Sequence, residues 1–178
     1  MQYDYFAVCD DIEPQIVNSC VVGFDISFVT NSPYAWTQEK TTEIIIPVPA
    51  DTSSTELPSV TQVVHVVNSE RLEEIFPVIT IVPNLVVTDS KLTYTITNNR
   101  DHGTMKLMNI LKDTTTIDCQ KAMISSTAGL LTIDELGWSD VDSIYWPRLY
   151  HGDNELVIKG QPATIILTYR EPRKVGAY

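Results

Sequence analysis

The apolar residues of this chain occur in short runs, and this feature most limits what the chain can fold into. The runs are rich in isoleucine, valine, threonine and tyrosine, and clusters of Asn, Asp, Ser, Pro and Gly separate them. Such runs are typical of β-strands, and turn clusters between them are typical of a sandwich. We therefore predict an all-β protein with a two-sheet antiparallel β-sandwich. The expected strands are residues 3–8, 21–29, 43–48, 61–67, 78–82, 92–97, 104–111, 115–119, 123–126, 155–159 and 163–169.

Turn residues predict how the strands follow one another. Residues 98–103 and 112–114 separate successive strand runs, which predicts a meander of antiparallel neighbours. Gly160, Gln161 and Pro162 separate the last two runs, which predicts a terminal hairpin. Only residues 70–75 and 131–136 hint at helix, and neither exceeds one or two turns.

The length and charge of the chain limit the function classes. A chain of 178 residues can bury one substantial core plus a small appendage. The net charge of -11 should repel nucleic acid and anionic membranes. No apolar run approaches the roughly 20 residues of a membrane helix, and no basic region precedes an apolar core at the N-terminus. We expect a soluble protein made in the cytosol, without nucleic-acid or membrane partners.

The cysteines and histidines do not form a recognisable site. Cys9, Cys20 and Cys119 are odd in number and widely spaced, without the pairing of zinc or redox motifs, so we expect three buried or half-buried thiols. The histidines lie in three separate segments without ligand spacing. We predict no metal and no cofactor. The histidines are His65, His102 and His151.

Two groups of residues are candidates for catalysis. Asp134, Glu135, Asp140 and Asp142 could supply the carboxylate pair of a glycosidase, but an acidic solvated loop explains them as well. The Ser125 and Ser126 pair lacks the strand-turn-helix context of a hydrolase nucleophile. We favour the solvated loop and predict that the chain is not an enzyme.

The last third of the chain carries the most distinctive pattern. Trp146, Pro147, Arg148 and Leu149 precede a turn that Gly152 and neighbouring Asp and Asn residues can form. We expect Arg148 to pin this loop through an ion pair or a guanidinium stack. The basic residues near the end of the chain form a solvated tail, dock on the carboxylates of a neighbour, or cap the edge of the sheet. They are Arg170, Arg173 and Lys174.

This pattern resembles the C-terminal end of siphophage distal tail proteins. The shared elements are W-P-R-L, a following G-x-N, a strand, a glycine, a second strand and a final R-E-P-R-K; further matches occur in order at residues 31–36, 76–81, 92–98 and 116–119, so the resemblance covers most of the chain. The candidate interface residues are Trp146, Pro147, Arg148, Leu149, Gly152, Asn154, Gly160, Tyr169, Arg170 and Arg173.

The resemblance implies a division of the chain. Residues 41–178 are expected to form a galectin-like, jelly-roll-like sandwich. Residues 1–40 are expected to hold a short two-strand extension, which corresponds to the end of a ring-forming N-terminal domain, followed by a polar linker at residues 37–42. The resemblance implies that the rest of that domain is missing from this sequence. Because two strands alone are marginal in water, residues 1–36 should lie against the sandwich, lie against another copy, or be poorly ordered.

The resemblance also implies a function. The chain would be a virion structural protein at the tail tip of a siphovirus or prophage, made and assembled in the bacterial cytoplasm. It would act as a hub for receptor-binding or side-fibre proteins in host adhesion, with the tail tube, the tape-measure end, a tail-associated lysin and further copies as partners. A baseplate subunit of a contractile tail would share this role. The alternative is a carbohydrate-binding module that contacts cell-wall glycan through the aromatic loops around Trp146 to Asn154.

Overall fold

The computed structural model describes residues 3–4, 7–30, 34–49, 56–67, 74–84, 91–127, 129–131, 136 and 144–174. The regular structure in this part of the chain is β-strand, which confirms the all-β prediction. It contains no helix with the length and apolar character needed to cross a membrane. The two segments expected to be helical lie mostly outside the described residues. Ile75, at the end of the first, instead forms an isolated antiparallel bridge with Leu149.

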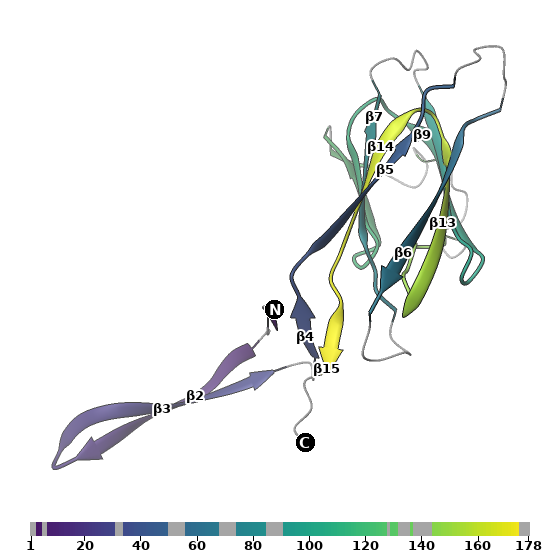
Figure 1. Cartoon of the computed structure of the whole chain (residues 1–178). Helices are drawn as coiled ribbons and strands as arrows, with labels where there is room; N and C mark the ends of the chain where they lie inside the picture. Colours follow the sequence, from purple (N-terminus) through teal and green to yellow (C-terminus); the bar gives the residue numbers. More distant parts are fainter. Residues whose placement is uncertain are drawn as a thin grey trace.

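Two antiparallel sheets face each other and form a sandwich (Figure 1). The six-stranded sheet has the order β12-β11-β10-β7-β14-β5, and the four-stranded sheet has the order β6-β13-β8-β9. The strands of the first sheet are β5 (Lys40–Ile46), β7 (Val78–Pro83), β10 (Thr115–Asp118), β11 (Met123–Ser126), β12 (Gly129–Leu130) and β14 (Ala163–Tyr169). Those of the second are β6 (Ser59–Val66), β8 (Leu92–Asn98), β9 (Gly103–Ile110) and β13 (Gly152–Gly160).

The core lies between the two sheets. Every second residue of β8 and of β14 is buried, because successive side chains of a strand point to opposite faces. Tyr94, Ile96 and Ile165 are each at most 1% exposed. Burying a side chain of this size contributes roughly 1.5–3 kcal/mol. The short apolar runs of the sequence thus become the two inner faces of the sandwich.

The predicted terminal hairpin is wrong. β13 pairs with β6 and β8, whereas β14 pairs with β5 and β7, so Gln161 and Pro162 carry the chain from one sheet to the other. The backbone N–H of Thr93 donates to Gln161 Oε1 at 2.7 Å, which holds this crossing in place. A hairpin and a crossing both keep Gly160 and Ala163 on the core side, so the alternation of apolar residues does not distinguish them.

The predicted meander is correct for one turn and wrong for the next. The turn at residues 99–102 joins β8 to β9, which are paired. Residues 111–114 instead connect β9 to β10, and these strands lie in different sheets. Local turn chemistry fixes where the chain reverses but does not fix the sheet in which the next strand pairs.

A third, smaller sheet joins the ends of the chain. Its order is β1-β4-β15, with β1 at Tyr3–Asp4, β4 at Tyr34–Thr37 and β15 at Pro172–Lys174. The basic end of the chain is therefore a paired strand. Of the expected polar linker, only Gln38 and Glu39 lie outside strands, because β4 ends at Thr37 and β5 begins at Lys40. The division between residues 40 and 41 stays a prediction.

An extended two-stranded ribbon projects from this small sheet, away from the sandwich (Figure 1). It consists of β2 (Ala7–Val17) and β3 (Cys20–Thr30), and it confirms the predicted two-strand extension. The expected strand at residues 3–8 is split, because β1 ends at Asp4 and β2 runs on to Val17. Asn18 and Ser19 have φ values of 51° and 67°, as a two-residue type I′ turn requires.

Candidate interaction surfaces

The β2–β3 ribbon has an apolar face and a polar face. Side chains paired across an antiparallel ladder share a face, and successive side chains alternate between faces. Gln15 Nε2 donates to Asp25 Oδ2 at 2.8 Å, so these two side chains share the polar face. This face also carries Asp11, Glu13 and Ser27 along its middle, and Val8, Val29 and Val17 toward its two ends. The opposite side is called the ribbon face below, and its members are Cys9, Ile12, Pro14, Ile16, Val21, Phe24, Ile26 and Phe28.

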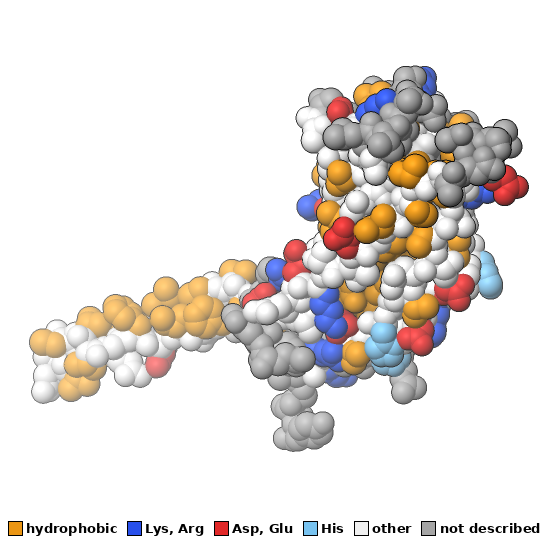
Figure 2. Space-filling model, turned by 45° about the horizontal axis from the view of Figure 1, so that its top comes forward, with side chains coloured by type: hydrophobic (Ala, Val, Ile, Leu, Met, Phe, Trp, Pro, Cys, Tyr) orange, Lys and Arg blue, Asp and Glu red, His pale blue; other side chains and the backbone are white. Residues whose placement is uncertain are grey.

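The ribbon face is uncovered. Phe24, Phe28 and Ile16 are 61%, 65% and 62% exposed. Figure 2 shows an almost continuous hydrophobic band along the ribbon. Monomeric soluble proteins rarely expose a contiguous apolar patch of this extent, and an isolated two-stranded hairpin is marginally stable in water. The ribbon face is therefore the strongest candidate for a contact with another molecule.

The loop before β13 is held by Asp101. The hydroxyls of Tyr145 and Tyr150 donate to Asp101 Oδ2 at 2.7 and 2.8 Å, and the Gly103 N–H donates to Oδ1 at 3.0 Å. Burial opposes the charge of Asp101, but these hydrogen bonds and the charge of Arg148 lower the pKa of Asp101. Burial and the nearby carboxylate raise the pKa of Tyr150 to about 12. The carboxylate therefore organises this loop as a charged acceptor.

A buried asparagine pair fixes the same loop to the sheet. Asn98 and Asn154 are 1% and 0% exposed. Asn98 Nδ2 donates to the carbonyl oxygen of Arg148 at 2.8 Å, and Asn154 Oδ1 accepts from the N–H of Tyr150 at 2.8 Å. Asn154 Nδ2 also donates to the carbonyl oxygens of Tyr150 and Gly152, at 2.8 and 3.1 Å. Such satisfied buried networks hold a loop in one conformation.

Arg148 forms the contacts that the sequence predicted for it. Its Nη1 lies 2.6 Å from Glu74 Oε2, and its guanidinium carbon lies 5.7 Å from the ring centre of Phe76 and 5.5 Å from that of Tyr145. Burial disfavours the charge of Arg148, but Glu74 outweighs it and raises the pKa of the guanidinium. Arg148 thus pins its loop to the segment that contains Glu74 and Phe76.

Glu171 joins the small sheet to the sandwich. Its side chain is 0% exposed and accepts from Lys40 Nζ at 2.6 Å, from the Val67 N–H at 3.0 Å and from Arg173 Nη2 at 2.8 Å. Its backbone exchanges two hydrogen bonds with Thr37, one of them through the Thr37 hydroxyl. A carboxylate can be buried when charged and neutral donors surround it. Glu171 belongs to the R-E-P-R-K pattern but is not among the candidate interface residues.

A groove opens beside this joint. Its apolar lining comes from Trp36, Ile75, Phe76, Val78 and Tyr169, and it encloses about 660 Å³. Glu39, Glu74 and Arg170 are its charged lining residues. The volume falls within the range of pockets that hold small ligands or several large side chains.

The structure brings most of the candidate interface residues to one end of the sandwich. The W-P-R-L loop, Gly152 and Asn154 lie there together with Tyr169, Arg170 and Arg173, because β6, which pairs with the start of β13, ends beside Glu171. Gly160 lies at the opposite end of β13, where the ring of Tyr94 packs against it. The interface role of these residues stays a prediction.

The loop around Trp146 uses its polar groups internally. The hydroxyls of Tyr145 and Tyr150 and the amide of Asn154 are bonded within the protein. Tyr145 and Trp146 are half-buried and pack against the core. The acidic candidates Asp134, Glu135, Asp140 and Asp142 lie outside the described residues. Among the described residues, no group of three or more His, Cys, Asp and Glu side chains is placed to hold a metal ion.

The prediction for the cysteines is only partly correct. Cys119 is buried, and burial followed by the charge of Asp118 raises the pKa of its thiol to about 12. Cys9 and Cys20 are exposed, contrary to expectation. Both lie on the projecting ribbon, which no other described part of the chain covers.

Comparisons with known proteins place the chain among phage tail proteins. The family model described as phage tail C-terminal domain matches residues 34–169. A solved structure, the Dit protein (gp 19.1) of phage SPP1, superposes with a TM-score of 0.53 at 16% sequence identity. That protein is described as a paradigm of the hub adsorption apparatus in phages that infect Gram-positive bacteria. The alignment covers 95% of this chain and 58% of the SPP1 protein. No curated protein sequence matches the chain.

Proposed function

Because the chain belongs to the phage tail C-terminal domain family and is a structural component of a phage tail, we propose that it acts as an assembly hub at the tail tip. In this role it binds other tail proteins and supports receptor-binding or side-fibre proteins. We place it in a long non-contractile tail, assembled in the bacterial cytoplasm. The SPP1 protein, which shares the fold, is described as part of a hub adsorption apparatus, and this supports the assignment.

One observation carries the proposal. The ribbon face is an unusually large apolar surface, and hydrogen-bond networks hold the end of the sandwich beside it. The ribbon face is exposed along its length. The end of the sandwich nearest to it is held by the Asp101, Asn154 and Glu171 networks. A surface of this kind gains stability when a partner covers it, and a rigid base fixes the direction in which that partner is held.

The role requires docking surfaces and does not require a reactive centre. The conspicuous buried carboxylate, Glu171, is fully used in holding strands together. The phenol groups of Tyr145 and Tyr150 serve the same purpose at Asp101. We propose a non-enzymatic protein on this basis.

Electron microscopy of virions tests the proposal. Gold-labelled antibodies against the chain should decorate the tail tip of intact particles. A phage in which the gene is disrupted should produce particles or tails that lack the tip structure and do not adsorb to host cells. Labelling of the capsid or of the tail shaft alone would contradict the hub assignment.

A further inference from the structure

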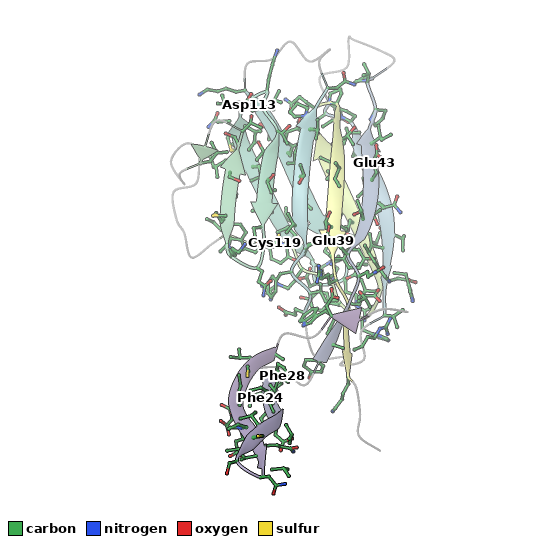
Figure 3. All side chains as sticks on the ribbon, turned by 90° about the vertical axis from the view of Figure 1, so that its left-hand side faces the viewer. Phe24, Phe28, Glu39, Glu43, Asp113 and Cys119 are labelled. Carbon is green, nitrogen blue, oxygen red and sulfur yellow. The ribbon has the colours of Figure 1, made fainter. Side chains whose placement is uncertain are left out.

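The groove at the joint lies apart from the ribbon and combines aromatic rings from three places in the chain. Trp36 lines it from β4, Phe76 from the segment before β7, and Tyr169 from the end of β14. Figure 3 shows Glu39, another lining residue, at the end of the six-stranded sheet nearest the small sheet and away from the ribbon. The groove encloses about 660 Å³, so it offers the space of a ligand pocket as well as aromatic walls.

Several side chains that line the groove keep their hydrogen-bonding groups free. They present an indole N–H, a carboxylate, an amide, a hydroxyl and a phenol, none of which has a partner in the part of the chain that the structure describes. By contrast, Glu74 is paired with Arg148 at 2.6 Å, and Arg170 is paired with Asp4 at 3.1 Å. A ligand with both donors and acceptors can use all the free groups. They belong to Trp36, Glu39, Gln120, Thr168 and Tyr169.

The free groups differ in what they offer a ligand. The indole N–H of Trp36 only donates, and the exposed carboxylate of Glu39 only accepts. Burial, followed by the charge of Glu171, raises the pKa of Tyr169, so its phenol keeps its proton and can donate or accept. Hydrogen bonds to a carboxylate are stronger than those between neutral groups, so Glu39 is the strongest acceptor in the groove.

From the rings and the free groups together, we propose that the groove binds a short, uncharged oligosaccharide. The C–H face of a pyranose ring packs on the face of an aromatic ring, and Trp36 and Phe76 supply such rings. Sugar hydroxyls donate to a carboxylate such as Glu39 and exchange hydrogen bonds with an amide such as Gln120. This inference adds a ligand-binding activity to the proposed assembly role and does not depend on that role.

The charge and polarity of the groove disfavour other ligands. Glu74 and Arg170 are neutralised by their ion pairs, which leaves Glu39 as the unpaired charge among the lining residues. A polymer that carries phosphate or uronate groups is therefore repelled. An apolar protein segment would take water from the free polar groups without replacing its hydrogen bonds, which costs free energy. An uncharged ligand rich in hydroxyl groups avoids both costs.

The groove is a different site from the aromatic loop around Trp146. In that loop the hydroxyls of Tyr145 and Tyr150 donate to Asp101, and the amide of Asn154 is bonded to backbone carbonyls. Those groups already have partners, whereas the free groups of the groove have none among the described residues. The groove is therefore the better place for a sugar to form new hydrogen bonds.

Calorimetric titration of the purified chain tests the site. The probes are tetrasaccharides of glucose, of galactose and of N-acetylglucosamine, with tetragalacturonate as the charged counterpart. Wild type should bind at least one neutral probe saturably and tetragalacturonate more weakly. Glu39→Gln should weaken binding of the neutral probe by about tenfold, because a hydrogen bond to a charged acceptor is lost. Trp36→Ala should weaken binding further, because it removes a ring from the groove.

Matched controls separate the groove from general effects of substitution. Glu43→Gln removes an exposed carboxylate of the same sheet outside the groove, and Phe28→Ala removes an exposed ring of the ribbon. Both variants should bind the sugar as wild type does. Because Trp36 is part of β4, its removal can disturb the small sheet. Glu39→Gln and Gln120→Ala change exposed side chains and decide the result if Trp36→Ala does not fold.

Several outcomes would overturn the proposal. One is the absence of saturable binding to every neutral probe, and another is tighter binding of tetragalacturonate. Sugar binding that survives both Glu39→Gln and Gln120→Ala, or that is lost only in Trp146→Ala, would place the sugar outside the groove. A Glu39→Gln protein that keeps its sugar affinity but is not incorporated into tails would assign the groove to a protein contact instead.

Discussion

The sandwich and the ribbon are both antiparallel β-structures with alternating apolar side chains, yet they end in opposite environments. In β8, Leu92, Tyr94 and Ile96 are 0–1% exposed, because the second sheet covers them. In the ribbon, Ile12, Phe24 and Ile26 are 51–61% exposed, because no second layer of the described residues packs on them. The same pattern therefore produces a core in one region and a contact surface in the other.

The stability of the fold and the association with other molecules are expected to depend on different regions of the chain. The sandwich, which includes most of the residues matched by the phage tail family, stabilises itself. The ribbon lies before the matched residues and leaves its apolar face exposed. Substitutions in the sandwich should change the free energy of unfolding, and substitutions in the ribbon should change association.

The largest expected difference comes from matched isoleucine substitutions. Ile96→Ala removes buried methyl and methylene groups from the core and should lower the free energy of unfolding by about 2–5 kcal/mol. Ile26→Ala on the ribbon should leave the unfolding of the sandwich within about 0.5 kcal/mol of wild type, because surface substitutions have small effects. Urea denaturation of dilute protein measures both. Similar losses in the two variants would show that the ribbon belongs to the same cooperative unit.

Glu171→Gln should have the next largest effect, at the joint between the two regions. The amide keeps an acceptor for the Val67 N–H but loses the charge that Lys40 and Arg173 bind. A loss of about 1–3 kcal/mol is expected for hydrogen bonds to a charged group. Amide exchange should accelerate in β4 and β15 more than in β8. Glu43→Gln, an exposed carboxylate on β5, is the control. Unchanged exchange in β4 and β15 would contradict the role given to Glu171.

The sequence predicted the strands well because their side-chain pattern is local. All the expected strands of the sandwich occur in the structure. The sheet to which each strand belongs is not local, and the crossings at residues 111–114 and 161–162 were therefore missed. The predicted first strand of the ribbon is too short, because strands usually exclude Asp, Glu and Pro. These residues are Asp10, Asp11, Glu13 and Pro14.

The sequence also predicts only some of the contacts in the candidate site. The contacts of Arg148 follow from its position beside aromatic residues, and the structure contains them. Glu171 could not be chosen, because its burial depends on Lys40 and Val67, which are distant in the chain. Asn98 and Asn154 did carry a signal. Each is a polar residue at a core-facing position of its strand, and such a residue needs buried hydrogen-bond partners.

Asp101→Asn should lower the free energy of unfolding by a smaller, pH-dependent amount. This substitution tests the hydrogen bonds at the end of the sandwich nearest the ribbon. The variant should lose about 1–2 kcal/mol near pH 7, because the tyrosine hydroxyls no longer donate to a charged acceptor. The pKa of Asp101 is lowered in the folded protein, so its contribution is present above the unfolded pKa of about 3.9 and is lost as the pH falls through the lower folded value.

Urea denaturation from pH 7 down to pH 3 checks this sign. The difference between wild type and Asp101→Asn should shrink toward the acidic end. Asp153→Asn, which removes an exposed carboxylate at the same end of the sandwich, is the control and should give a smaller difference near pH 7. A difference that grows with acidity would mean that the carboxylate does not accept these hydrogen bonds as an anion.

The smallest effect concerns the reactivity of the cysteines and not stability. The thiols of the ribbon should react at a different rate from the thiol of the sandwich. Cys9 and Cys20 should react quickly with an aromatic disulfide reagent at pH 8, whereas Cys119, buried and with a pKa of about 12, should react only on unfolding. Cys9 lies on the ribbon face, while Cys20, paired with Val17, lies on the opposite face. Assembly through the ribbon face should therefore protect Cys9 and leave Cys20 reactive. Mass spectrometry of labelled peptides, with Cys9→Ser as the control, distinguishes this outcome from burial of the whole ribbon, in which both thiols would be protected together.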